Sequence, residues 1–278
     1  MLIRYGFRLS ISVAQPTDVL ARLDVHPSRR GDIVSEVPLM AGGRAAELPT
    51  IDVYGNLCRR LTVLPGENAF ELSGVMHDPG TYEPRISDEA ATPVSELPEE
   101  CLVYLLGSRY CETDRLADMA WQLFGHLQPG AARVKAIVNY VHKHLTFGYA
   151  FARPTRTALE AVNEGVGVCR DFAHLTIALC RCLNIPARYV NGYLGDIGVP
   201  RDPAAMDFSA WTEVFLGGRW FTLDARHNTP RIGRIVIARG RDATDVPMVH
   251  SFGPHILNEF KVITEEITAD AQAQQQAA

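Results

Sequence analysis

A cysteine that follows two closely spaced glycines is the strongest chemical feature of the sequence. Residues 165–180 read GVGVCRDFAHLTIALC, and the spacing of apolar residues after Cys169 predicts an amphipathic helix that runs to about Leu183. A thiol in the first turn of a helix lies near the positive end of the helix dipole and near unpaired backbone N–H groups, which favour the thiolate. The same N–H groups can bind an oxyanion. Cys169 is therefore a candidate nucleophile; the alternative is a buried cysteine at a helix end.

A predicted hairpin positions a second group of candidates. Two glycines separate the run SAWTEVFL (209–216) from the run RWFTLD (219–224), and a two-residue turn there pairs Trp211 with Asp224. Side chains two residues apart on a strand share a face, so Ser209 is expected diagonal to Asp224, at roughly 7–8 Å between backbones. A histidine at position 209 would span that gap, whereas a serine would need a water molecule.

Other histidines and charged residues near these segments are expected to be structural. His174 lies about one and a half turns beyond Cys169 on the predicted helix. His227 follows the hairpin in what the pattern indicates is a surface loop, and for both residues a structural role is favoured over that of a base. Arg170 and Asp171 are expected to serve the helix terminus and a salt bridge. His142 and His144 are expected on a solvated face of the second helix.

Both segments resemble the core of the transglutaminase-like superfamily. The stretches GVGVCRDFAHL and SAWTEVFLGGRWFTLD are similar to that core, which has a cysteine at a helix N-terminus, a histidine in an H-A-W context on one strand and an aspartate on the next, arranged as in papain-like proteases. The resemblance implies Cys169 as nucleophile and Asp224 as the orienting acid. It also implies Trp211 as a substrate-binding residue, and it puts Ser209 in the position of the catalytic histidine. The first hundred residues and YLLGSRYCETD resemble bacterial members as well, so the resemblance covers most of the chain.

The resemblance implies a cysteine hydrolase or acyl transferase that acts on peptide or amide bonds. In such enzymes the histidine takes the thiol proton and later gives it to the leaving amine, and a serine does neither at pH 7. Two alternatives stay open: a catalytically impaired or inactive peptide-binding member of the same fold, and a conventional enzyme in which position 209 was altered. A protease or amidase is favoured over a protein cross-linking enzyme, because the resemblance is to short bacterial members and no calcium-site motif is present.

The order of the predicted elements indicates an α+β fold with two domains. Residues 1–99 contain short β-rich runs between turn signals and predict an antiparallel β-domain, whose polar, proline-rich end from Asp78 to Glu99 has the character of a connector. Residues 100–266 are predicted to form the transglutaminase-like core, with the nucleophile at a helix N-terminus packed on an antiparallel sheet, and 267–278 a polar low-complexity tail. Helices are expected at 113–123, 134–145, 157–163 and 169–183, followed by strands at 187–194, 208–216 and 219–224.

The composition of the chain limits the classes of partner that it is expected to bind. The 278 residues are 47% hydrophobic and 21% charged, with a formal net charge of -5, and they contain no long Lys/Arg run. Neither nucleic acid nor membrane is expected as a partner; a peptide or protein amide is the expected substrate. Six sparse cysteines fit a reducing compartment, and no signal peptide or membrane span is evident, so a cytoplasmic location is expected. The spacing of Cys and His residues favours neither a metal nor another cofactor.

Overall fold

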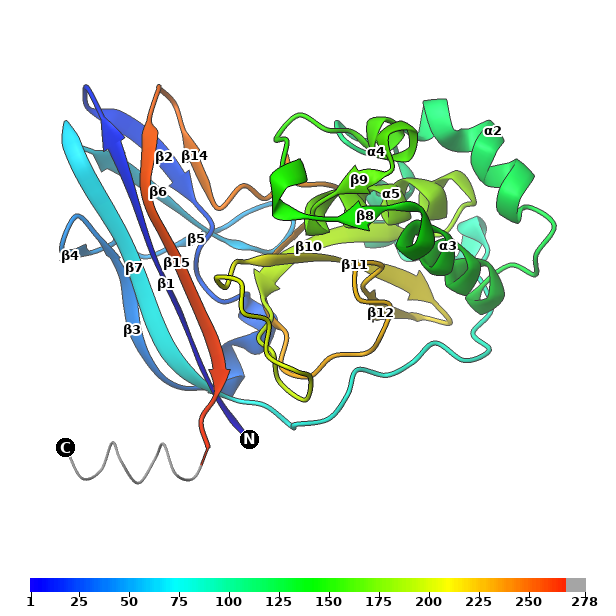
Figure 1. The fold of residues 1–278 in the computed structure, drawn as a ribbon, viewed down its shortest axis with the longest axis horizontal. Helices are drawn as coiled ribbons and strands as arrows, with labels where there is room; N and C mark the ends of the chain where they lie inside the picture. The colour runs from blue at the N-terminus through cyan, green and yellow to red at the C-terminus, as the bar shows by residue number, and fades with distance from the viewer. Residues whose placement is uncertain (269–278) are drawn as a thin grey trace.

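The computed structural model describes residues 1–268, so the predicted tail at 267–278 lies almost wholly outside the described residues. A β-rich half and a helix-rich half lie side by side (Figure 1). This is the expected α+β fold. No helix in the described part combines the length and hydropathy needed to cross a membrane.

The β-rich half consists of two antiparallel sheets. Their strands are β1 (Leu2–Val13), β2 (Thr17–Ala21), β3 (Ile33–Ala41), β4 (Arg44–Ala45), β5 (Thr50–Ile51), β6 (Leu57–Val63), β7 (Gly66–His77), β14 (Val249–Ser251) and β15 (Ile256–Glu266). One sheet has the order β15-β1-β7-β3-β4 and the other β14-β2-β6-β5. The odd-numbered apolar residues of β1, from Ile3 to Ile11, are buried, which is the period-two pattern of a strand with one face in the core.

The helix-rich half has most of its helices on one face of a four-stranded sheet of order β12-β11-β10-β13, while the shortest helix packs against Phe215 on the other face. Its helices are α1 (Glu99–Leu102), α2 (Thr113–Phe124), α3 (Ala131–His144), α4 (Ala158–Glu164) and α5 (Cys169–Cys182). Its strands are β8 (Thr146–Phe147), β9 (Val166–Gly167), β10 (Ala187–Tyr193), β11 (Ser209–Leu216), β12 (Arg219–Leu223) and β13 (Ile235–Gly240). Glu112 occupies the N-cap position of α2.

Helix α5 is the centre of this half. It is buried along almost all of its length from Asp171 to Cys182, and it packs on β10 and β11 with α2, α3 and α4 around it. Asn184 takes a left-handed φ of 60°, and the proline at 186 follows, so the helix ends where the sequence predicts. The first residue of this helix, Cys169, thereby lies close to the Ala210 backbone near the start of β11.

The β11–β12 hairpin has the register expected from its diglycine turn. Gly217 and Gly218 have φ of 54° and 83°, which suits a turn that favours glycine at both positions. Leu216 pairs with Arg219, and the ladder runs on to Thr212 opposite Leu223. The ladder ends there, one position short of the predicted pair of Trp211 and Asp224.

The C-terminal strands differ from the expected division of the chain. The second domain was expected to run from 100 to 266, but β14 pairs with β2 and β15 pairs with β1, so both belong to the sheets of the β-rich half. In β15 the inward residues are Val262 and Thr264, a period-two pattern that needs a neighbouring strand. The edge of β1 supplies it.

Aromatic contacts join the two halves. The rings of Tyr5 and Tyr193 meet edge to face at 5.5 Å, and Phe7 and Phe208 lie 5.8 Å apart. Phe208 also contacts Phe260 of β15 at 5.7 Å. Because Phe208 directly precedes Ser209, the β-rich half helps to fix the strand end that carries the second candidate residue.

Candidate active site

The loop before α5 is held by an aspartate that folds back on it. Asp171 Oδ2 accepts a hydrogen bond from the Val168 N–H at 2.9 Å, and Arg156 Nη1 donates to the same oxygen at 3.0 Å. A Cβ at position 167 would lie 2.7 Å from the Asp171 Cβ, so only Gly167 fits under this side chain. Asp171 thus serves the helix terminus and a salt bridge, as expected. It fixes the backbone around Cys169 without using the thiol.

Cys169 is the one partly exposed cysteine, since the other five are buried. Burial raises the pKa of its thiol to about 11, although the backbone N–H of Ala210 and the Arg226 guanidinium favour the thiolate. The helix terminus was expected to favour the thiolate, but the cost of removing the thiolate from water outweighs that effect here. The thiol is therefore protonated at pH 7, and a nucleophilic role requires a proton acceptor.

Two hollows open on Cys169, and Ser209 lines both. The first, called here the polar hollow, has about 60 Å³ of space and is also lined by Asp207, Arg226 and His227. The second, the apolar hollow, has about 470 Å³. Its other walls are Tyr110, Pro154, Arg170, Tyr189, Asn191, Phe208, Ala210, Ala243, Thr244, Val246, Pro247, Met248 and His250.

Ser209 begins β11 and pairs with Gly192 of β10. Thr212 faces α5, since its Oγ1 donates to the Ala173 carbonyl at 3.3 Å. Ser209 and Trp211, at odd-numbered positions of the same strand, therefore lie on the other face of the sheet. Ser209 itself is 7% exposed. The structure therefore brings Ser209 and Cys169 to the walls of the same two hollows.

The Asp224 carboxylate forms an ion pair with an arginine, Arg234, that the sequence pattern did not indicate. Arg234 Nη2 donates to Asp224 Oδ2 at 2.8 Å, and the same guanidinium lies 4.8 Å from the Trp211 ring centre. Trp211 and Asp224 thus share a face, as the register predicts. Burial alone would raise the pKa of Asp224, but Arg234, His227 and backbone N–H groups hold it below its usual value.

Trp211 does not occupy the position that the expected substrate-binding role requires. It is 1% exposed and packs with Val190 and Val236 beneath Arg234. A side chain so deeply buried supports the sheet and the arginine rather than contacting a substrate. The physical reason is parity: the ring turns to the face opposite α5, which the β-rich half and Arg234 cover.

The comparisons with known proteins agree with this architecture. Residues 118–225 match the model of the transglutaminase-like superfamily. The chain has a transglutaminase-like core. A crystal structure of a candidate cysteine protease from Cytophaga hutchinsonii matches with a TM-score of 0.83 and 27% identity, over 97% of this chain and 92% of that one.

Two uncharacterised mycobacterial proteins also share part of the core. One from Mycobacterium leprae is 35% identical over 117 residues, which are 39% of this chain and 40% of that protein. One from Mycobacterium bovis is 29% identical over 144 residues, which are 49% of this chain and 46% of that protein. The chain thus spans less than half the length of these curated relatives.

His227 is the histidine that the transglutaminase-like core brings into the polar hollow with Cys169. Asp224 Oδ1 accepts from the backbone N–H groups of Arg226 and His227, a turn that folds the chain back over the carboxylate. His227 Nε2 lies 4.0 Å from Asp224 Oδ2, and its Nδ1 accepts from Arg231 at 3.3 Å. Burial lowers its pKa to about 4, so it is neutral at pH 7. The D-A-R-H sequence carries the turn signal that could have located it.

His174 is structural, and His142 and His144, which were expected on a solvated helix face, each lie within hydrogen-bond distance of a backbone carbonyl. His174 is fully buried, its pKa is lowered to about 3 chiefly by burial, and its Nε2 accepts from the Ala243 N–H at 3.1 Å. His142 Nδ1 lies 2.9 Å from the Ala225 carbonyl and His144 Nε2 2.7 Å from that of Val162.

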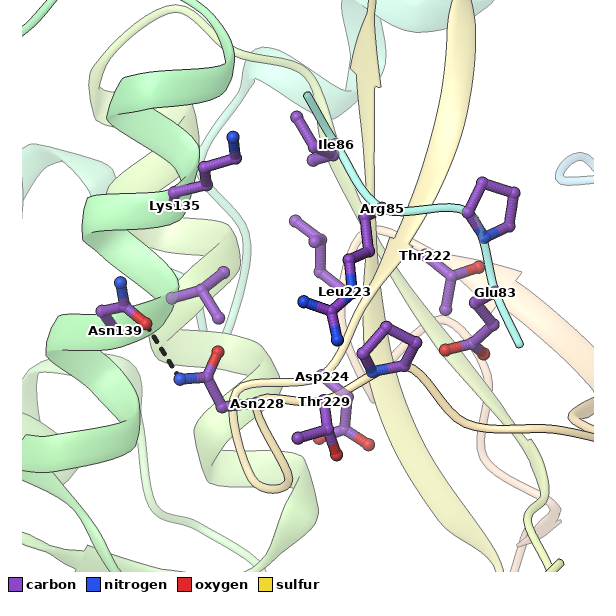
Figure 2. Close-up of a pocket in the computed structure, with 13 residues that line it drawn as sticks. Glu83, Arg85, Ile86, Lys135, Asn139, Thr222, Leu223, Asp224, Asn228 and Thr229 are labelled. Carbon is purple, nitrogen blue, oxygen red and sulfur yellow. Dashed lines mark hydrogen bonds between the residues drawn. The ribbon is translucent and has the colours of Figure 1, made fainter. Parts of the chain in front are cut away.

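A third cavity of about 320 Å³ lies against Asp224 (Figure 2). It is bounded by the 78–99 connector, α3 and β12, and Asn139 accepts a hydrogen bond from Asn228 across it at 2.9 Å. Arg85 and Lys135 project from its walls. Asp224 lines this cavity and Cys169 does not, so the two residues line different cavities.

Proposed function

We propose that this protein is a cysteine hydrolase or acyl transferase acting on peptide or amide bonds, with Cys169 as nucleophile and protease or amidase use favoured over cross-linking. The observation that carries the proposal is the position of Cys169. It begins α5 of a transglutaminase-like core, and it is the partly exposed cysteine, at the junction of two hollows.

In this reaction the Cys169 sulfur bonds to the carbonyl carbon, the C–N bond breaks, and the amine leaves with a proton. Water, or an amine in acyl transfer, then takes the acyl group from the thioester and restores the thiol. The proposed donors to the oxyanion are the backbone N–H groups of Cys169 and Arg170 at the start of α5, since that of Asp171 already bonds the Val168 carbonyl. The thiol proton needs an acceptor, because burial keeps the pKa of Cys169 at about 11.

The alternative is an impaired or inactive peptide-binding protein on the same fold. Two observations favour it. Position 209 is a serine, and Asp224, the expected orienting acid, is bound to Arg234 at 2.8 Å. In that case Cys169 would still react with strong electrophiles, but amide turnover would be slow.

Alkylation by iodoacetamide, followed by mass-spectrometric mapping, tests the nucleophile, and hydrolysis of an activated ester or amide tests turnover. Cys169 should label first. Its rate should rise about tenfold per pH unit toward pH 11, because the thiolate is the reactive form. Turnover that disappears in Cys169→Ser and persists in the matched Cys58→Ser supports the enzyme; labelling without turnover supports the binding protein. Labelling of a buried cysteine before Cys169 would overturn both.

The proposed partner is a peptide or protein amide, and the proposed compartment is the cytoplasm. All six cysteines are free, including the closely spaced Cys180 and Cys182, which supports a reducing environment. Fractionation of cells that express the protein with a C-terminal epitope would test the location; recovery in an exported fraction would contradict it.

A further inference from the structure

The apolar hollow beside Cys169 has the size and lining of a ligand site. Its volume of about 470 Å³ lies within the range of about 300–1,000 Å³ that small-molecule sites occupy. Aromatic and aliphatic side chains dominate its walls, and those of Tyr110, Pro247 and Met248 are partly exposed. Such a surface gains most from an apolar occupant that removes it from water.

The hollow is held open by a rigid strap, residues 243–250, which joins the helix-rich half to β14. The Ala243 N–H donates to His174 Nε2 at 3.1 Å, and the Val246 carbonyl accepts from Asn191 Nδ2 at 2.8 Å. The Met248 carbonyl accepts from the Arg22 N–H of the β-rich half at 2.9 Å. Three anchors along six residues make this a preformed site.

The charges around the hollow disfavour a charged occupant. Among residues 1–268, no Asp or Glu lines it. Its one arginine, Arg170, is engaged: it donates to the Arg153 carbonyl, and its guanidinium carbon lies 5.6 Å from the Tyr110 ring centre. A carboxylate or ammonium buried here would lack a free partner of opposite charge, which carries a large free-energy penalty.

The two hollows differ in the groups that can move protons. The polar hollow is lined by Asp207, Arg226 and His227, whereas the apolar hollow has one imidazole, that of the exposed His250 on the strap, among mainly apolar side chains. The leaving amine needs a proton as the C–N bond breaks, so the amine side of the substrate belongs near the titratable groups. The acyl side of the substrate would then bind in the apolar hollow.

We infer that the apolar hollow binds a bulky aromatic or branched aliphatic side chain on the acyl side of the amide that Cys169 attacks. The inference rests on the proposed role of Cys169 and names the substrate class of that site. Ala243 and Met248, on the strap, would contact the bound side chain.

Peptidyl chloromethyl ketones test this on the full-length protein, whether or not it turns over amides. In each, the Cys169 sulfur displaces chloride from the CH₂Cl carbon, forming a thioether and releasing chloride and a proton. The reagents compared are acetyl-Ala-X chloromethyl ketones in which X is Phe, Leu, Gly, Asp or Lys. For each protein variant, the rate at which a reagent labels Cys169 is divided by the rate at which iodoacetamide labels it. Phe and Leu reagents should react at least about tenfold faster than Gly, and Asp and Lys should fall below them.

Two variants of the strap and one matched control test whether the preference for Phe over Gly arises in the apolar hollow. Ala243→Trp fills the hollow and should bring the Phe/Gly ratio close to one. Met248→Asp puts a carboxylate into it and should move the preference toward the Lys reagent, which a misfolded protein would not show. Ala205→Trp, the same change in the wall of the polar hollow, should keep the Phe/Gly ratio.

Equal normalised rates for all five reagents, or a preference for Asp, would overturn the inference while leaving Cys169 as the nucleophile. A Phe preference that survives Ala243→Trp would overturn it as well, because the side chain would then bind elsewhere. If Cys169 does not react even with iodoacetamide, the proposed function fails first, and the substrate class with it.

Discussion

The end of α5 that carries Cys169 and the hairpin that carries Ser209 and Asp224 differ in what their acidic groups do. At α5, the carboxylate of Asp171 binds Arg156 and the Val168 N–H, so it shapes the backbone and leaves the thiol free. At the hairpin, the carboxylate of Asp224 is the one expected to orient a base, yet it binds Arg234. The backbone around the proposed nucleophile is held by Asp171, whereas the hairpin carries a serine at position 209 and an aspartate already paired with Arg234.

The difference shows that a nucleophile motif and its catalytic partners are separable. The helix terminus around Cys169 depends on contacts between residues three to fifteen positions apart, whereas the groups on the hairpin depend on where later loops pack. A chain can therefore present a well-built cysteine site while the groups that would move its proton are rearranged. Each experiment below changes one side of this comparison.

Ser209→His should have the largest effect, because it supplies an imidazole on the face that Asp224 shares. Hydrolysis of an activated ester or amide should rise by about 10²–10⁴-fold, the usual range for general acid–base help. The pKa of Cys169 should fall below its present value of about 11, since an imidazolium favours the thiolate. Stopped-flow hydrolysis and the pH profile of alkylation measure the two effects.

Ser209→Asn is the matched control for that experiment, being polar and of similar reach but unable to act as a base at pH 7. Efficient hydrolysis by the serine form, unchanged by Ser209→His, would show that another group such as His227 or Asp207 already serves Cys169. The hairpin would then not be the incomplete side.

Arg234→Met should unfold the hairpin side more easily, because it leaves Asp224 buried without its main partner. Loss of one member of a buried ion pair costs about 3–5 kcal/mol, and urea unfolding would measure it. The exposed pair Arg4–Glu265 offers a control, in which Arg4→Met should cost about 1 kcal/mol or less. The double variant Asp224→Asn, Arg234→Met should recover part of the loss; if Arg234→Met costs no more than Arg4→Met, Arg234 does not hold Asp224 in place.

His227→Gln should reduce the loss of folding stability that occurs as the pH falls from about 6.5 to about 4. The folded protein lowers the pKa of His227 to about 4, so between about pH 6.5 and 4 the unfolded chain binds more protons than the folded one. Stability contributed by the neutral imidazole is present above about pH 6.5 and is lost as the pH falls toward 4. Urea midpoints at pH 7 and pH 4.5 should therefore differ less in His227→Gln than in wild type or in the exposed control His77→Gln. An equal difference in all three would place His227 in solvent.

Proteolysis of the 78–99 connector should have the smallest consequence. Its exposed Arg85 offers a trypsin site, although Lys135 bonds the Ser87 carbonyl at 2.7 Å and Glu83 pairs with Arg234 nearby. Cleavage there should leave the two halves associated on size-exclusion chromatography, because the Tyr5–Tyr193 contact and the β1–β15 pairing join them. Cleavage confined to the C-terminal tail would argue that the connector is part of one fused unit.

Local signals in the sequence were enough for the scaffold around the nucleophile. Gly167 and the helical pattern after Cys169 predict a thiol at a helix N-terminus, and the diglycine at 217–218 predicts the register that sets Trp211 beside Asp224. These features follow from backbone sterics and from contacts a few residues apart, so the order of residues determines them.

Tertiary structure decided the rest. The pairing of β15 with β1 joins residues about 250 positions apart, and a turn at Gly233, with φ of 77°, brings Arg234 onto Asp224. Burial sets the pKa of Cys169 high, and the strap at 243–250 creates the apolar hollow. Each of these depends on which distant surfaces pack together and exclude water, and desolvation is a property of the packed chain that no local pattern of residue types carries.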